Sequence, residues 1–292
     1  MRSKREQRHG GLSHRYWKLA LGEWIALSLA FIGVVLVFCL FIIRRQTLEY
    51  KLEHTFAVSS PEFFSSALAL GNPVPVEGNK IELLNNGDEY FPQMLDAIRS
   101  AKKTINFAAY IMKSDGVGHQ FRDAFIERAR AGVEVRVLLD GIGSGWSLDN
   151  SDVRMMKEAG CKFDYYHPVA SWRMDRTNRR SHRRILVVDG KVGFTGGAAF
   201  SEKWSGHAQD EHHWRDAQVR VEGPVVAALQ AAFQSHWVKT YDEALTGGDQ
   251  FPPLQPAGTL RAQVVESRSF SSAPVAMVQA VTFAAAEKRI WI

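Results

Sequence analysis

The most reactive segment of the sequence spans residues 173–184, where six arginines and one aspartate accompany His182. This segment leads into the apolar run Ile185–Val188, which is typical of a strand. On a strand, His182 and Arg184 are two positions apart and project from the same face. A guanidinium holds the nonbridging oxygens of a phosphodiester, and its charge favours the neutral, nucleophilic form of a neighbouring imidazole. The pair is suited to covalent phosphoryl transfer without a metal.

The remaining polar segments have simpler interpretations. A solvated basic loop is the alternative for residues 173–184, and charge alone would favour it. The glycines of residues 141–145 follow an apolar run but match no phosphate-binding spacing, so we interpret them as a strand-exit loop. Residues 207–213 hold three histidines, which we interpret as a solvated loop, and we predict no metal or other cofactor. The only cysteines, Cys39 and Cys161, lie in regions of different character, which excludes a disulfide framework.

The positive charge of the chain is unevenly distributed. Its 292 residues carry a formal charge of +5, from 36 Lys and Arg against 31 Asp and Glu. Residues 1–60 hold nine of these basic residues and four acidic ones, whereas residues 61–292 hold twenty-seven of each. The body is therefore neutral, and we predict no nucleic-acid partner.

Residues 24–43 form twenty consecutive uncharged and mostly apolar positions. A helix of that length spans ~30 Å, the thickness of a bilayer core, so we predict an uncleaved transmembrane helix. A buried helix of a soluble fold and a cleaved signal peptide are the alternatives. Six basic residues precede the run and three follow it, which favours a cytoplasmic N-terminus. We therefore expect a single-pass protein of the inner membrane with its body on the non-cytoplasmic face.

Beyond the predicted linker, short β-rich runs alternate with amphipathic stretches, as in an α/β layered domain. The expected strands are Ile81–Leu84, Thr104–Ile111, Val133–Leu139, Lys162–Tyr166, Ile185–Val188, Lys191–Thr195 and Val219–Val221. The expected helices are Glu89–Ala101, Phe121–Ala131, Asp149–Ala159 and Pro224–Trp237. Asp189-Gly190 predicts a tight hairpin turn between the fifth and sixth of these strands.

The C-terminal residues resemble an earlier part of the chain. A shift of 185 positions lays Ala101, Lys103 and Ile105 onto Ala286, Lys288 and Ile290, so we expect residues 290–292 to lie in a strand at the opening of a second copy. The predicted organisation is a basic cytoplasmic tail at 1–23, a transmembrane helix at 24–43, a linker at 44–80, a domain at 81–245, and a linker with a truncated repeat at 246–292.

The motif His182-x-Arg184-x4-Asp189, followed by Gly196-Gly197, resembles the H-x-K-x4-D motif of the phospholipase D superfamily. Its surroundings resemble the bacterial cardiolipin synthase branch, at Tyr110-Ile111 with Asp115 and Gly118, Arg128-Ala129, Gly132-Val133, Val137–Ser144 and Trp214-Arg215-Asp216. The resemblance implies a phospholipase D-like α/β/α sandwich that occurs twice, with two motifs at one active site. It also implies that one histidine forms a phosphohistidine while the other is the general acid.

The resemblance assigns roles to individual residues. His182 corresponds to the nucleophile, and Arg184 is the phosphate anchor at the position of the family lysine. We assign substrate contacts to Gly196, Gly197, Arg180 and Arg183. Asp189 is a motif member whose expected role is structural, because seven strand residues at ~3.3 Å put it ~23 Å from the nucleophile.

This sequence departs from the family pattern in three respects. Arg184 replaces the lysine, Ala199 replaces the usual asparagine, and the second motif is absent. The first hypothesis is a membrane-anchored phosphatidyltransferase of cardiolipin synthase type, acting on a phosphatidylglycerol-like lipid and completed by a second half. That half would come from a homodimer, a separate chain or an unseen remainder. The alternatives are a catalytically silent fragment that binds anionic head groups or a partner, and a nuclease-type phosphodiesterase.

Overall fold

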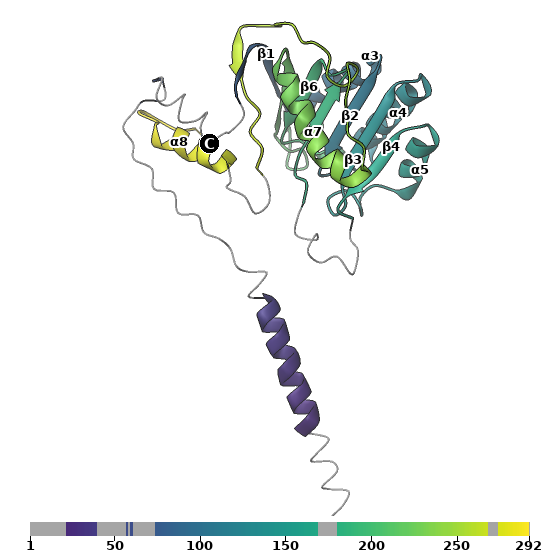
Figure 1. Cartoon of the computed structure of the whole chain (residues 1–292), viewed down its shortest axis with the longest axis vertical. Coiled ribbons are helices and arrows are strands. Elements are labelled where there is room, and N and C mark those ends of the chain that lie inside the picture. The colour runs from purple at the N-terminus through teal and green to yellow at the C-terminus, as the bar shows by residue number, and fades with distance from the viewer. Residues whose placement is uncertain are drawn as a thin grey trace, which may run out of the picture. The chain divides into compact units, whose positions relative to one another are not determined.

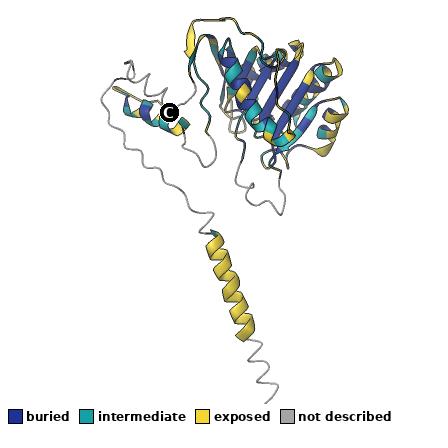
Figure 2. Cartoon of the chain, in the orientation of Figure 1, coloured by how far each residue is buried: buried dark blue, intermediate teal, exposed yellow. Residues whose placement is uncertain are grey.

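The computed structural model describes residues 22–39, 57, 59–60, 74–168, 180–267 and 274–291. The chain divides into two units, Met1–Leu52 and Glu53–Ile292. In the first unit, the helix Gly22–Cys39 has a mean hydropathy of 2.2, which is long and apolar enough to cross a membrane. Its side chains are almost all exposed (Figure 2). The predicted tail up to residue 21, residues 40–43 and most of the predicted linker lie outside the described residues.

The second unit is built on an eight-stranded mixed sheet of order β4-β3-β2-β5-β6-β7-β1-β8 (Figure 1). Strands β2, β3 and β4 are parallel, and all the other pairings are antiparallel. The strands are β1 Val76–Asn85, β2 Thr104–Ala109, β3 Glu134–Asp140, β4 Lys162–Tyr166, β5 Ile185–Val188, β6 Val192–Gly196, β7 Ala217–Glu222 and β8 Leu260–Ala262.

Helices cover both faces of this sheet, which confirms the α/β/α class predicted from the sequence. The helices are α3 Asn86–Ser100, α4 Gly116–Arg130, α5 Asn150–Glu158, η1 Glu202–Trp204, α7 Val225–Tyr241 and α8 Pro274–Ala284. Apolar side chains of α3, α4 and α5 form one buried cluster with the sheet, and those of α7 form another on the opposite face. Strand β2 is therefore buried along its whole length, as an inner strand between two helical layers must be.

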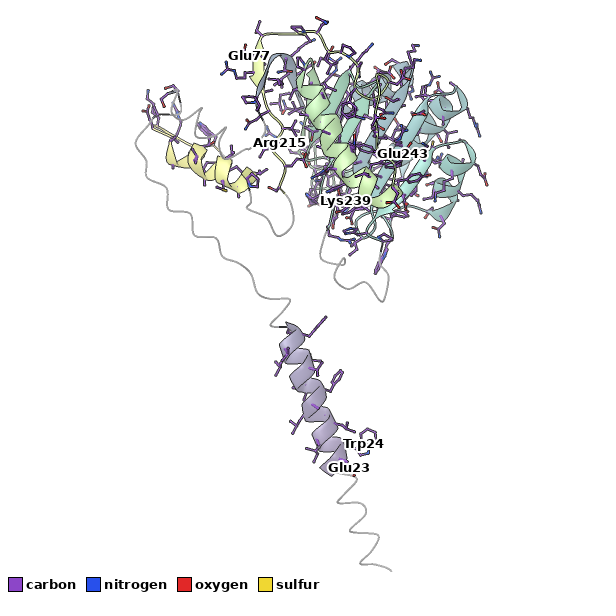
Figure 3. The ribbon with its side chains drawn as sticks, viewed as in Figure 1. Glu23, Trp24, Glu77, Arg215, Lys239 and Glu243 are labelled. Atoms are coloured by element: carbon purple, nitrogen blue, oxygen red, sulfur yellow. The ribbon has the colours of Figure 1, made fainter. Side chains whose placement is uncertain are left out.

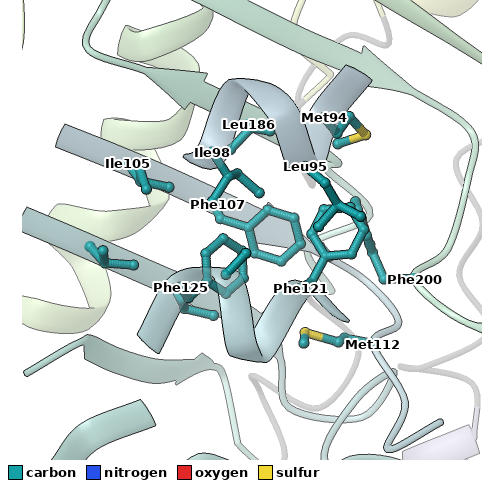
Figure 4. Close-up of a cluster of buried hydrophobic side chains, with 14 of the residues drawn as sticks. Met94, Leu95, Ile98, Ile105, Phe107, Met112, Phe121, Phe125, Leu186 and Phe200 are labelled. Carbon is teal, nitrogen blue, oxygen red and sulfur yellow. The ribbon is translucent and has the colours of Figure 1, made fainter. Parts of the chain in front are cut away.

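The larger cluster is rich in aromatic rings (Figure 4). Phe107 of β2 packs edge-on against Phe200 with ring centroids 4.6 Å apart, and Phe121 of α4 meets the same Phe200 ring at 4.9 Å. Phe200 lies four residues beyond the end of β6, so these contacts fix the chain leaving β6 against the helical layer. Edge-to-face aromatic pairs of this kind add ~0.5–1.5 kcal/mol each beyond burial.

The prediction of a strand at residues 290–292 is wrong at positions 290 and 291, which the structure describes. These two residues belong to no helix or strand. A strand needs a neighbour to satisfy its backbone groups, and no described strand pairs with this segment. Other expectations differ at their ends. Strand β1 begins at Val76 rather than Ile81, and α4 begins at Gly116 rather than Phe121. Strand β8 and helix α8 were not predicted.

Candidate active site

The chemistry-bearing residues meet at one edge of the sheet. Strands β2 and β3 end at this edge, and the antiparallel β5 begins there. Strand β6 also ends there, at Gly196, which is paired with Gln218 near the start of β7. Four segments from distant parts of the sequence therefore converge around His182, which lies just before β5.

His182 and Arg184 lie in direct contact, although both precede β5, which begins at Ile185. Arg184 Nη1 is 3.0 Å from His182 Nδ1, and Arg184 Nη2 is 3.2 Å from His182 Nε2. Arg184 Nη1 also donates to the carbonyl oxygen of His182 at 3.1 Å. On the other side, the ring of Tyr110, which directly follows β2, packs against the imidazole with centroids 4.7 Å apart. The imidazole is thus held between a phenol ring and a guanidinium.

This arrangement favours the neutral form of the imidazole. His182 retains contact with solvent, but partial burial of its ring lowers its pKa below the usual value. The charge of Arg184 lowers that pKa further, and the carboxylate of Asp140 acts in the opposite direction. Burial also lowers the pKa of Arg184, against the attraction of Asp216 and Tyr110. A neutral imidazole has the free lone pair that a nucleophile requires.

Asp140, a residue that sequence reasoning missed as a functional residue, organises the backbone before His182. Its fully buried carboxylate accepts from the N–H of Ser181 at 2.8 Å and from the N–H groups of Ile142 and Gly143 at 2.9 and 3.1 Å. It also accepts a hydrogen bond from Arg180 Nη1 at 3.3 Å. The amides of the glycine-containing loop thus bind an internal carboxylate. A lone aspartate closing an apolar run was the available signal.

The two consecutive glycines after β6 permit a close approach of the chain. A Cβ at Gly197 would lie 2.2 Å from Asp216 Oδ1, and a Cβ at Gly196 would lie 2.3 Å from the carbonyl oxygen of Ala217. Asp216 in turn accepts from Trp204 Nε1 at 3.0 Å, and its charge acts on Arg184. The glycine pair therefore brings a carboxylate close enough for its charge to act on the guanidinium, beyond ion-pair distance.

Two of the other predicted site residues, Asp189 and Arg183, point away from His182 to different parts of the domain. Asp189 lies at the far end of β5, in the hairpin turn, and accepts from the backbone N–H groups of Lys102, Lys103 and Thr104 at 2.7–2.9 Å. Arg183 points to the α7 face, where it donates to Ser235 Oγ at 2.6 Å and to Glu266 Oε2 at 2.7 Å. Three more arginines of the basic segment, at positions 173, 176 and 179, lie outside the described residues.

A cavity of about 1020 Å³ opens beside these groups. His182, Arg184, Arg180 and Arg183 line it, together with Gly196 from β6. The same cavity has apolar walls that include Ile185, Leu229, Val264 and Val265. A phosphate with an aliphatic substituent suits this mixture of cations and apolar side chains.

The histidine-rich segment 207–213 behaves as a local surface network. His213 Nδ1 lies 2.6 Å from Asp210 Oδ1, and His207 Nδ1 lies 3.3 Å from Asp88 Oδ2. Among the described residues, no group of three or more His, Cys, Asp or Glu side chains could hold a metal ion.

Comparison with known proteins shows which family this sequence resembles. Residues 94–237 match the family model described as "Cardiolipin synthase, PLD-like domain". Cardiolipin synthase 1 of Bacillus anthracis is 36% identical over 198 residues, which cover 68% of this chain and 39% of the relative. Cardiolipin synthase 1 of Bacillus cereus is 41% identical over 54% of this chain and 31% of the relative. Cardiolipin synthase A of Pseudomonas syringae is 34% identical over 82% of this chain and 51% of the relative. The chain thus spans about half, or less, of the length of these curated relatives.

Proposed function

Because residues 94–237 belong to the cardiolipin synthase branch of phospholipase D-like domains, we propose that this chain carries one half of a phosphatidyltransferase site with His182 as nucleophile. The observation that supports the proposal best is the contact of a neutral imidazole with an arginine at the mouth of a cavity. The proposed substrate is a phospholipid phosphodiester such as phosphatidylglycerol, which offers a phosphate for Arg184 and aliphatic groups for the apolar walls.

The proposed reaction has two displacements at phosphorus. In the first, an imidazole nitrogen of His182 attacks phosphorus, the P–O bond to the alcohol group breaks, and the departing alkoxide takes a proton from a general acid. In the second, the hydroxyl of an acceptor alcohol gives its proton to the conjugate base of that general acid and attacks phosphorus, the P–N bond breaks, and the neutral imidazole is released. Arg184 stabilises the charge on the nonbridging oxygens in both steps. To do so, its guanidinium must turn from the imidazole to the phosphate.

The general acid is proposed to come from a second phospholipase D-like half. Beside His182, the described residues place the phenol of Tyr110 and the guanidinium of Arg184, and neither is an imidazole, the commonest general acid of enzymes. A positioned acid is typically worth ~10²–10⁴-fold in rate. A second copy of this chain or a separately encoded chain would supply it. The helix Gly22–Cys39 is proposed to anchor the assembly in the inner membrane, with the basic N-terminal segment in the cytoplasm.

Product formation tests the proposal. Membranes that contain the full chain, incubated with phosphatidylglycerol, are expected to form cardiolipin, measured by mass spectrometry. His182→Ala should abolish the product, whereas His212→Asn, which alters an exposed histidine, should leave it unchanged. Equal product from the His182→Ala variant would overturn the assignment. The full chain should also yield an acid-labile phosphohistidine at His182 with labelled lipid.

A catalytically silent fragment is the second candidate, because the Arg184 guanidinium contacts the imidazole itself, and Ala199, which stands in place of the asparagine of the family pattern, is fully buried. Such a protein would bind anionic head groups through the same cations. A trapped phosphohistidine at His182 excludes this candidate. Head-group binding without phosphohistidine or product would favour it.

A further inference from the structure

A buried amide without a hydrogen-bond partner lies at the active-site edge of the sheet. Strand β7 begins two residues after Arg215, which Figure 3 labels, and its second residue is Gln218. The Gln218 side chain is only 1% exposed, and among the described residues neither its Nε2 nor its Oε1 has a hydrogen-bond partner. An unpaired buried donor and acceptor cost free energy, so we expect this amide to gain a partner in another state of the protein.

Arg184 carries a complementary unpaired group. Its two terminal nitrogens contact His182, whereas its Nε is buried and has no partner among the residues that the structure describes. The Nε–H of an arginine is a donor, and the Oε1 of a glutamine is an acceptor. Arg184 stands at the position of the family lysine, and a lysine has no donor at this place in its side chain.

The strand register places the two unpaired groups close together. Gly196 of β6 is paired with Gln218, and a Cβ at Gly196 would lie 2.6 Å from Gln218 Oε1, so the amide oxygen lies over this glycine. On the other side of β6, Thr195 Oγ1 donates to the carbonyl oxygen of Arg184 at 2.9 Å. Neighbouring strands are ~4.8 Å apart. Arg184 and Gln218 are therefore separated by one strand, which has no side chain at Gly196.

The two side chains also belong to the same side of the sheet. Arg183 and Ile185 both lie on the α7 face, where Arg183 contacts a serine of α7 and Ile185 belongs to the α7 cluster. Because side chains of an extended chain alternate between faces, Arg184 projects toward the opposite face. Gln218 is paired with Leu84, which belongs to the buried cluster on that opposite face. The guanidinium can thus reach the amide across Gly196.

We propose that Gln218 is a positioning residue for Arg184, whose Nε donates to Gln218 Oε1 when the guanidinium turns from His182 to a bound phosphate. This inference rests on the proposed function, in which Arg184 stabilises the charge of the phosphate. The bond adds to the affinity for phosphate, because two unpaired groups gain a partner on binding. It also gives a reason for an arginine at the lysine position, since a lysine cannot form this bond.

Binding of inorganic phosphate to the purified full chain in detergent tests the positioning role. Gln218→Met keeps the length of the side chain and removes both polar atoms. It is expected to weaken phosphate binding about tenfold, the effect of one hydrogen bond from a charged donor, measured by calorimetry. In an Arg184→Lys background, the same substitution should change the affinity by less than about twofold, because lysine has no Nε–H. Losses of similar size in both backgrounds, or no loss in either, would overturn the proposal.

The melting temperature of the free protein separates positioning from packing. The Gln218 amide is unpaired in the structure, so Gln218→Met should leave the melting temperature unchanged or raise it. Gln230 is a matched control, because its amide is also fully buried but is paired with Asn106 at 3.2 Å and with Gln250 at 3.0 Å. Gln230→Met should lower the melting temperature and leave the phosphate affinity of the folded protein unchanged. Equal destabilisation by the two substitutions would contradict the role given to Gln218.

NMR of the arginine side chains observes the proposed bond itself, and it decides the case if Arg184→Lys binds phosphate too weakly to be titrated. In the wild type, saturating phosphate should slow the exchange of the Arg184 Nε–H with water, and Gln218→Met should abolish this protection. Unchanged exchange, or no phosphate binding by the wild type at millimolar concentration, would overturn the inference.

Failure of the proposed function is read separately, from product formation by the wild type and His182→Ala. A protein that forms no product, but in which phosphate still protects the Arg184 Nε–H, would retain the positioning role of Gln218 without the transferase activity.

Discussion

Replacing Asp140 by asparagine is expected to loosen the backbone that carries His182. The Asp140 carboxylate is fully buried and accepts four donors, one of them the N–H of Ser181. In Asp140→Asn, the amide oxygen still accepts hydrogen bonds from the loop N–H groups of Ile142 and Gly143. The amide NH₂ then faces the Ser181 N–H, so two donors meet. The segment that leads into His182 thereby loses its anchor.

The magnitude follows from the bonds that are lost. One charge-assisted hydrogen bond contributes ~1.5–3 kcal/mol, and a buried donor left unsatisfied costs ~1–3 kcal/mol. Arg180 loses a charged partner but keeps its bond to the carbonyl oxygen of His167 at 2.8 Å. The expected loss is therefore about 3–5 kcal/mol, which is large against a total stability of ~5–15 kcal/mol but leaves the chain folded.

Chemical denaturation and histidine NMR measure the two consequences. The free energy of unfolding of the body should fall by about 3–5 kcal/mol in Asp140→Asn. Asp149→Asn, which changes an exposed helix N-cap that makes no side-chain cap bond, should stay within ~0.5 kcal/mol of the wild type. The pKa of His182 should fall, because the Asp140 charge raises it in the wild type. A loss below 1 kcal/mol, or a rise in the pKa of His182, would refute the reasoning.

Three further substitutions test neighbouring parts of the structure. Arg184→Gln should raise the pKa of His182, because it removes a cation in contact with the ring, whereas Arg184→Lys should leave that pKa low; histidine NMR in the two variants decides. Gly197→Ala should cost ~1–3 kcal/mol and reduce activity, because the new methyl would meet Asp216, while Gly248→Ala, which meets nothing within 4 Å, should be neutral in thermal unfolding. Hydrogen bonding to Arg136 lowers the pKa of Glu243 to about 2, so its contribution of ~3 kcal/mol is present above pH ~4.5 and is lost as the pH falls toward 2. When the free energy of unfolding is measured as the pH is lowered, Glu243→Gln should not lose this contribution. A loss of stability in acid equal to that of the wild type would contradict the role given to Glu243.

The sequence predicted the central elements because their signals are local. The continuous apolar runs of β3 and β5 match the structure to within one residue, and the Asp-Gly turn lies where it was expected. The N-terminal end of α4 was missed because glycines are poor helix formers. Gly118 is nevertheless required there, since a Cβ would lie 1.7 Å from the carbonyl oxygen of Lys113. The short β8 depends on pairing with β1, which is a tertiary contact.

The site was predictable only within one segment. The expected contact of His182 with Arg184 is present because the two are close in sequence, but both lie before β5 rather than in a strand. Tyr110 contacts the imidazole and Asp140 acts on it through its charge, from the ends of β2 and β3, and local periodicity does not predict the order of strands in a sheet. The role of α7 in the cavity is likewise a consequence of packing between distant segments.

The two ends of β5 are coupled through strand register, which gives Asp189 a role at a distance. Its carboxylate binds three consecutive N–H groups at the start of β2, and its own N–H donates to the carbonyl oxygen of Thr104 at 2.8 Å. These bonds fix the register in which Ile105 opposes Val188 and, three residues on, Ala108 opposes Ile185. A slip of one residue would turn every side chain of β2 to the other face of the sheet. Tyr110 would then leave the imidazole, so the aspartate at one end of the motif positions the partner of the histidine at the other.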